Sequence, residues 1–261
     1  MSSFLHRLFR RGKKTAAAFV DFEHWCISMQ KLYGQKPDVK VWYQLIRQQY
    51  DVVDVVFFGD FSGSLRYELE QIRSVTQNII ETQNSGTKYK KDFTDFLMLD
   101  YIYRYSMRNR NVDTYILFTG DGHFTSVVNY LMMECKKEVV IHGVDGATSK
   151  KLKDEASACI EFPTAEQKRM QCIQAILRNL DRLNVKRRGR SWVTFMKTVQ
   201  RVSELEELPE DEVKAGMQYL VDEGYLVREY RYNRGRRIAV LSVEWELLER
   251  DKVYSCEGQI R

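Results

Sequence analysis

Short runs of hydrophobic and β-branched residues recur along the first three-fifths of the 261-residue chain, and each is typical of a buried strand. They span residues 16–21, 52–58, 77–82, 112–118 and 137–142. Between them, hydrophobic residues repeat every three or four positions, which predicts helices over residues 38–48, 64–75, 93–105 and 123–134. Strands and helices that alternate in this way predict a mainly parallel sheet covered on both faces. We therefore expect a three-layer α/β/α domain over residues 15–162.

The pattern changes after Pro163. Hydrophobic residues then fall on one face of each of three predicted helices, at residues 166–183, 192–201 and 209–224. Two strand-like stretches, 225–232 and 236–243, flank a short turn that contains a glycine. Three helices followed by a β-hairpin predict a small α+β domain of winged-helix type over residues 166–250. Residues 1–14 then form a basic N-terminal tail, and residues 251–261 form a C-terminal tail.

Composition is that of an ordinary globular protein, with 44% hydrophobic and 30% charged residues. No hydrophobic run approaches the ~18 residues that a membrane-spanning helix needs. The five cysteines are widely spaced and form no Cys-x-x-Cys motif, so they indicate neither a zinc site nor a disulfide framework and fit a cytoplasmic location. The formal net charge is +5, and basic segments flank a mildly acidic middle. That distribution fits a polyanionic partner.

Three carboxylates stand where predicted elements begin or end. Asp21 ends the first strand, Asp95 lies at the front of a helix, and Asp121 follows a strand in the segment Thr119-Gly120-Asp121-Gly122-His123. Open parallel sheets bind their ligands at the carboxyl ends of the strands. Carboxylates gathered at that edge would repel one another unless a divalent cation lay between them. We therefore expect Asp21, Asp95 and Asp121 to bind Mg²⁺ or Mn²⁺.

Nearby polar residues are candidates for the rest of a catalytic site. Thr119 would hydrogen-bond a ligand carboxylate or a water molecule. His123 and His24 would protonate a leaving oxygen or orient a water, because imidazole titrates near neutral pH. Asp100 is a further candidate, although it lies about 140° around the helix from Asp95 at ~100° per residue. Taken alone, each aspartate is better explained as a helix N-cap; the coincidence of three favours a metal site.

These motifs, in this order, resemble those of NYN domains, a branch of the PIN-like nucleases. The resemblance rests on Phe19-Val20-Asp21, on the helix opening from Lys91 to Asp100 and on the turn from Leu117 to Phe124. It implies a parallel sheet between helices and metal-dependent hydrolysis of RNA phosphodiesters, with the three aspartates as metal ligands. The chain departs from the pattern twice, since family members often carry Asn at the position of His24 and a second Asp at that of His123.

Basic residues predict the surfaces that would contact RNA. Lys88, Lys90 and Lys91 lie in a loop just before the second aspartate. In the C-terminal domain arginines alternate with tyrosines, a combination that suits phosphate contacts and base stacking. The candidates there are Arg187, Arg188, Arg231, Arg234, Arg236 and Arg237. The third helix begins with acids, so the hairpin is the expected contact. A solvated loop explains the lysines as well, and a protein-binding or dimerising winged helix with solvated arginines explains the second set.

The favoured function is a metal-dependent ribonuclease whose basic domain helps to bind RNA. One alternative is a non-catalytic RNA-binding or regulatory protein, in which His24 and His123 mark lost chemistry. The other is a phosphatase of the haloacid dehalogenase type, suggested by Asp21-x-Glu23 and Gly120-Asp121. That type requires a carboxylate four or five residues past Asp121, where the chain has Thr125 and Ser126. We expect no membrane partner, and self-association into a homo-oligomer stays open.

Overall fold

The computed structural model describes residues 12–61, 66, 68–82, 93–187, 193–233 and 235–255, without the side chains of 184–187 and 233. The chain divides into two compact units, one ending at Phe162 and the other beginning at Pro163. Residues 1–11 of the predicted basic tail and residues 256–261 lie outside the described part. The four cysteines in that part, Cys26, Cys135, Cys159 and Cys172, are free thiols.

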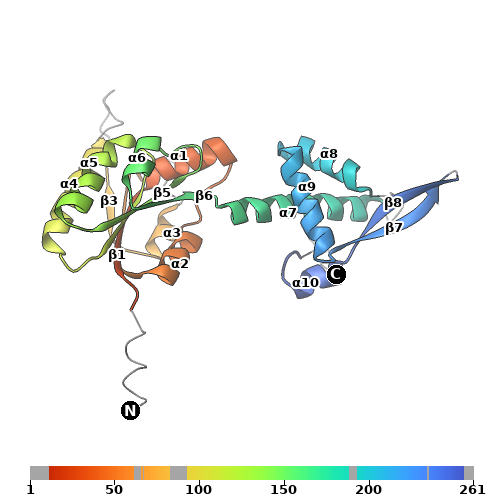
Figure 1. Cartoon of the computed structure of the whole chain (residues 1–261), viewed down its shortest axis with the longest axis horizontal. Helices are drawn as coiled ribbons and strands as arrows, with labels where there is room; N and C mark the ends of the chain where they lie inside the picture. The colour runs from red at the N-terminus through yellow and green to blue at the C-terminus, as the bar shows by residue number, and fades with distance from the viewer. Residues whose placement is uncertain are drawn as a thin grey trace, which may run out of the picture. The chain divides into compact units, whose positions relative to one another are not determined.

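Six parallel strands form the sheet of the first unit (Figure 1). They are β1 (Thr15–Asp21), β2 (Asp51–Gly59), β3 (Ile79–Glu81), β4 (Thr114–Phe118), β5 (Glu138–Val144) and β6 (Ala158–Phe162). Every residue of β4 and every residue of β1 after Thr15 is buried, because helices cover both faces of the sheet centre. The predicted mainly parallel α/β/α architecture is confirmed.

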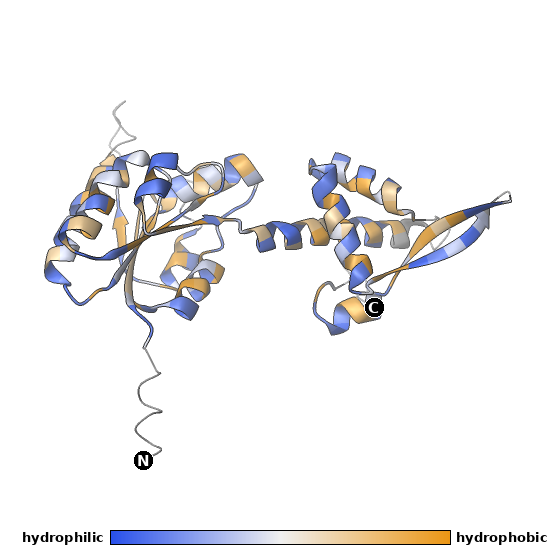
Figure 2. Ribbon diagram, viewed as in Figure 1, coloured by the Kyte–Doolittle hydropathy of each residue, from blue (hydrophilic) through white to orange (hydrophobic). Residues whose placement is uncertain are grey.

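Side chains of each central strand point alternately into two separate hydrophobic layers. In β1, Ala16, Ala18 and Val20 enter the layer formed with helices α1 (Phe22–Tyr33), α2 (Val39–Gln49) and α3 (Leu69–Arg73). Ala17 and Phe19 enter the layer formed with α4 (Phe93–Arg108), α5 (Thr125–Asn129) and α6 (Lys150–Glu155). These helices carry hydrophobic and hydrophilic residues on different faces (Figure 2). Two full cores therefore hold the sheet in place.

The order of the strands reverses between β1 and β4, the kind of point at which doubly wound sheets bind ligands in a crevice. The strands run β3-β2-β1-β4-β5-β6, so the chain builds outward from β1 in one direction and then returns to build outward from β4 in the other. At such a reversal the connections leave neighbouring strands toward opposite faces, which opens a gap at their carboxyl ends. Residues that follow β1 and β4 therefore border the place where doubly wound sheets bind ligands.

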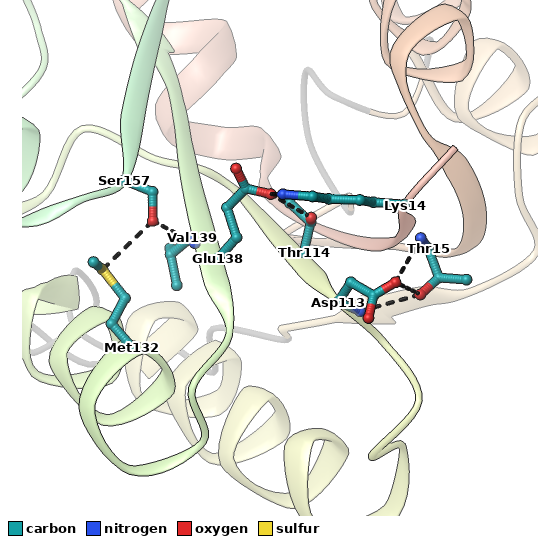
Figure 3. A network of polar contacts seen from close by, with 8 residues as sticks. All are labelled: Lys14, Thr15, Asp113, Thr114, Met132, Glu138, Val139 and Ser157. Atoms are coloured by element: carbon teal, nitrogen blue, oxygen red, sulfur yellow. Dashed lines mark hydrogen bonds and ion pairs between the residues drawn. The ribbon is translucent and has the colours of Figure 1, made fainter. Parts of the chain in front are cut away.

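Polar contacts connect the central strands at their amino-terminal ends, far from the carboxyl ends where ligands bind (Figure 3). Lys14 Nζ lies 3.0 Å from Glu138 Oε2, which also accepts a hydrogen bond from Thr114 Oγ1 at 2.8 Å. Thr15 donates from its backbone N–H and its hydroxyl to Asp113 Oδ2. These contacts join the starts of β1, β4 and β5 and hold the three strands in register. They leave the carboxyl ends of the strands available for a ligand.

The second unit contains three helices, a β-hairpin and a short last helix. These are α7 (Ala165–Arg187), α8 (Phe195–Glu206), α9 (Glu210–Asp222), β7 (Leu226–Asn233), β8 (Arg236–Val243) and α10 (Trp245–Arg250). Ile176, Val202 and Leu220, one from each of the first three helices, are among the residues of a third hydrophobic core. The elements follow the predicted order, and the winged-helix assignment of this unit stays a prediction.

Several elements differ from those expected. The helix predicted over residues 64–75 is described only as α3, five residues long. The helix predicted over 123–134 consists of a 3₁₀ turn η3 (Gly122–Phe124), α5 and a π-helical turn η4 (Tyr130–Glu134). Helices α1, α6 and α10 and strand β6 were not among the predicted elements. The spacing of Phe22, Trp25 and Met29 suits a helix, whereas β6 is short and carries a glutamate.

Candidate metal centre at the crevice edge

Asp21 is the last residue of β1 and the N-cap of α1. Its Oδ1 accepts a hydrogen bond from the backbone N–H of His24 at 3.0 Å. The side chain is 5% exposed, because the neighbouring strands and helices enclose the strand end. A carboxylate has two oxygens, so capping through Oδ1 does not use Oδ2.

Asp121 lies in the turn after β4 and caps η3. Its Oδ1 accepts the backbone N–H of His123 at 2.8 Å and lies 3.1 Å from His123 Nδ1. The backbone N–H of Asp121 donates to the hydroxyl of Thr119, and the N–H of Thr119 donates to the carbonyl of His142 in β5. Thr119 is fully buried, and the contact of its hydroxyl is with the backbone of the turn, whereas the predicted partner was a ligand carboxylate or a water.

Gly120 allows this turn to lie against its surroundings. A Cβ at this position would collide with the carbonyl oxygen of Ala147 and with the imidazole of His24. The carbonyl of Gly120 accepts the backbone N–H of Ser149 at 2.8 Å. The loop at residues 147–149 therefore supports the turn that carries Asp121, a contribution that no feature of the sequence signals.

Asp95, in the first turn of α4, joins Asp121 and His123 in one group. Each of the three offers one ligand atom, and these atoms all lie within 4.8 Å of one another. Asp95 and Asp121 are half-buried and His123 is exposed. This differs from the predicted ligand set, because Asp21 is outside the group among the described residues and His123 is within it. Asp21 caps its own helix from a more enclosed position at the end of β1.

The carboxylates of the group nevertheless affect the pKa of Asp21. The pKa of its carboxyl is raised to about 7, chiefly by burial and to a lesser extent by the carboxylate of Asp95. Glu23 and Asp121 act in the same direction, while the hydrogen bond from His24 opposes them. Asp21 therefore borders the centre as a carboxyl group that is partly protonated at neutral pH, and positive charge added nearby would favour its ionised form.

His24 and Asp100, the other two predicted site residues, lie outside the group of ligand atoms. His24 is largely enclosed, its Nε2 lies 3.4 Å from Ser28 Oγ, and burial lowers the pKa of its imidazole. Its ring packs against the turn at Gly120. Asp100 forms an exposed ion pair with Arg104 at 3.0 Å, one turn along α4, so the structure does not bring it into the group of ligand atoms.

Two half-buried carboxylates and an imidazole, beside a further buried carboxyl, form a donor set that suits a divalent cation. The oxygen donors match Mg²⁺ or Mn²⁺, and the imidazole nitrogen is a common ligand of transition-metal ions such as Mn²⁺. This arrangement lies in the region where the family model for the NYN domain matches, at residues 15–163. The chain belongs to the NYN domain family. That family is part of the PIN-like nuclease superfamily.

A solved structure supports the fold of the NYN domain. A protein of unknown function from Vibrio parahaemolyticus is 20% identical in sequence and superposes with a TM-score of 0.53. The match covers 58% of this chain and 94% of that one. At this identity the likeness shows the fold alone. A comparison with curated proteins finds no matching relative. Among the helices that the structure describes, none has the length and hydrophobicity needed to cross a membrane.

The predicted RNA-binding residues fall partly outside the described part of the chain. Lys88, Lys90 and Lys91, which precede α4 of the NYN domain, lie outside it, as do Arg188 and Arg234. Arg187 ends α7, and its side chain is not described. Arg231, Arg236 and Arg237 are exposed on the hairpin of the second unit. The two strands do not present these three arginines on one face.

Proposed function

We propose that this protein is a divalent-metal-dependent ribonuclease, with its active centre at Asp95, Asp121 and His123. The observation that carries the proposal is the convergence of their ligand atoms within 4.8 Å at the crevice between β1 and β4. Membership of the NYN family supports phosphodiester hydrolysis as the chemistry. RNA as the substrate rests on the family resemblance and on the basic residues of the chain.

The residues of the centre divide the work of hydrolysis. Asp95 and Asp121 would hold the cation, and a cation bound there supplies both screening of the phosphate charge and a water of lowered pKa. Nδ1 of His123 pairs with Asp121, so in this proposal Nε2 delivers a proton to the leaving oxygen and does not serve as a third metal ligand. Thr119 and Gly120 fix the turn, so that Asp121 faces the crevice with little freedom to reorient.

Removing either carboxylate tests the proposal. Asp95→Asn and Asp121→Asn keep the size of each side chain but remove its charge, and each is expected to lower cleavage on the order of 10²-fold or more. The assay incubates purified protein with mixed cellular RNA in Mg²⁺, in Mn²⁺ and in chelator, and maps the cut ends. Circular dichroism checks the fold of each variant.

Asp100→Asn is the matched control, since Asp100 lies on the same helix as Asp95 but pairs with Arg104 at the surface. We expect it to cleave like the unmodified protein. Cleavage that persists in both Asp95→Asn and Asp121→Asn, or that is unaffected by chelator, would disprove the proposal. An Asp100→Asn variant that loses activity equally would show that the effect is not specific to the centre.

A further inference from the structure

The hairpin of the second unit has two chemically different faces. β7 and β8 pair antiparallel, with Tyr230 opposite Ala239 and Tyr232 opposite Arg237. Because side chains alternate across a strand and directly paired residues share a face, these four lie on one face. We call this set the tyrosine face. Arg231 is opposite Ile238, so it lies on the other face.

The tyrosine face is not used by the hydrophobic core. At the base of the same face, Leu226 and Leu241 are buried and belong to the core of the unit. Farther along the hairpin Tyr230 is 57% exposed and Tyr232 is 73% exposed. Large aromatic rings so open to water, next to one another on a rigid ladder, are typical of surfaces that stack on a ligand.

Arg237 lies over one of these rings. Its guanidinium carbon lies 3.7 Å from the centre of the Tyr230 ring. A stacked guanidinium keeps its N–H donors at the edge of the plane, where they can bind a phosphate. Arg228, on the same face nearer the base, lies over the ring of Phe195 at 5.8 Å in a similar manner. The face thus alternates aromatic rings with fixed positive charges.

The opposite face carries Arg231 and Arg236 together with an acid, Glu229. Arg231 lies 3.4 Å from the carboxylate of Glu229, two residues away on the same face. Part of its charge is therefore neutralised within the protein. Two arginines on one hairpin with the same formal charge are thus in different settings: Arg237 on an exposed tyrosine, and Arg231 beside an acid.

We propose that the tyrosine face binds single-stranded RNA, with a base stacked on Tyr232 and a phosphate bound by Arg237, which Tyr230 positions. Unpaired bases expose both of their faces for stacking, whereas a duplex presents chiefly phosphates and ribose hydroxyls. This surface offers aromatic rings on which unpaired bases can stack. It has only a few charges to bind the phosphates of a duplex. The inference rests on the proposed ribonuclease function, and it narrows the substrate class to unpaired RNA.

The test measures binding to the full-length protein in chelator, so that cleavage plays no part. The probe is a fluorescein-labelled RNA strand of mixed sequence without self-complementarity, used alone and annealed to its complement, with anisotropy as the readout. Tyr232→Ala is expected to weaken binding of the single strand about tenfold, while Tyr232→Phe keeps the ring and should bind within about twofold of the unmodified protein.

Arg231→Ala is the matched control for Arg237→Ala, because both remove one positive charge from the same hairpin. Arg237→Ala should weaken single-strand binding about tenfold and reduce its salt dependence by about one released ion, whereas Arg231→Ala should change the affinity about twofold or less. Equal losses in both arginine variants, or a duplex bound as tightly as the single strand, would overturn the proposal.

The two proposals fail separately in these assays. If the hairpin variants bind RNA as tightly as the unmodified protein while Asp121→Asn abolishes Mn²⁺-dependent cleavage, the tyrosine-face proposal fails and the nuclease proposal stands. If single-strand binding depends on Tyr232 but the protein cleaves no RNA, the tyrosine-face proposal stands and the nuclease proposal fails.

Discussion

Asp21 and Asp121 each begin a helix with one carboxylate oxygen and border the candidate centre with the same side chain. Strand ends and helix starts are adjacent in an α/β fold, so an aspartate at this point satisfies the backbone N–H groups of the helix and also faces the ligand crevice. The capping and metal interpretations of these residues are thus compatible. What separates the two aspartates is burial, since Asp21 is the more enclosed.

Asp21→Asn tests the electrostatic cost of this burial. The pKa of the carboxyl rises from 3.8 to about 7 on folding, so the folded protein binds more protons than the unfolded chain between those pH values. The free energy of unfolding should therefore fall as pH rises from about 4 to about 7, by up to about 4 kcal/mol at 1.36 kcal/mol per pH unit. Asparagine keeps the cap and removes this decline.

Urea unfolding in chelator, at pH 4.5 and at pH 8, measures this effect. We expect Asp21→Asn to be more stable than the unmodified protein at pH 8 and nearly equal to it at pH 4.5. Asp100→Asn, which alters an exposed ion pair, should show no comparable difference between the two pH values. The same stability difference for Asp21→Asn at both pH values would contradict the burial argument.

The residues of the candidate centre could be predicted from the sequence more readily than their roles. Asp21, Asp95 and Asp121 were identifiable because each stands where a hydrophobic run begins or ends. Periodicity does not determine which side-chain atoms come within reach of one cation, because this depends on how far each strand end is enclosed. His123 enters the group through a 3₁₀ turn that the pattern treats as part of a helix. Asp100 lies about 140° around the helix from Asp95, which agrees with its exposed ion pair with Arg104.

Between elements, a buried hydrogen bond joins α2 to β5. Trp42 Nε1 donates to His142 Nδ1 at 2.8 Å, and both residues are almost fully buried. Burial lowers the pKa of His142 to about 3, so the ring stays neutral and can accept. The carbonyl of His142 also accepts the N–H of Thr119, at the start of the turn that carries Asp121. Helix α2 is thus connected to the candidate centre through β5.

Trp42→Phe is expected to destabilise the protein more than Trp25→Phe. Both substitutions reduce a buried indole of the same hydrophobic core to a phenyl ring. Trp42→Phe also leaves His142 Nδ1 without its donor, whereas Trp25 Nε1 has no hydrogen-bond partner in the described part of the chain. The difference in the free energy of unfolding should be about 1–3 kcal/mol, measured by urea denaturation. Equal losses would show that packing alone accounts for the Trp42 site.

The elements differ in how far the sequence predicts them. Strands β1, β4 and β5 are continuous hydrophobic runs because both faces of the sheet are buried, and this gave the correct fold class. Strand β6 was missed because it is short, includes Glu161 and is buried only at Phe162. The order of the strands is set by pairings between distant segments, and local periodicity contains no information about them.

At the scale of the whole chain, the two units have separate cores and different grounds for their interpretation. The family match ends at residue 163, so it concerns the first unit alone. The interpretation of the second unit rests on its own sequence pattern and on its hairpin. Each unit contains its own set of large buried residues, which is the condition for it to unfold as a separate cooperative transition.

Mn²⁺ should therefore raise the melting temperature of the first unit and leave that of the second unchanged. A ligand that binds only the folded state at 100 times its Kd stabilises by about 2.7 kcal/mol, or about 5–10 °C for a domain of this size. Calorimetry of the full chain with and without Mn²⁺ measures the shift, and a separate fragment of residues 163–261 assigns the transitions. Asp121→Asn should abolish the shift. If both transitions move, or if the shift survives in Asp121→Asn, the cation is stabilising the protein from somewhere other than the crevice between β1 and β4.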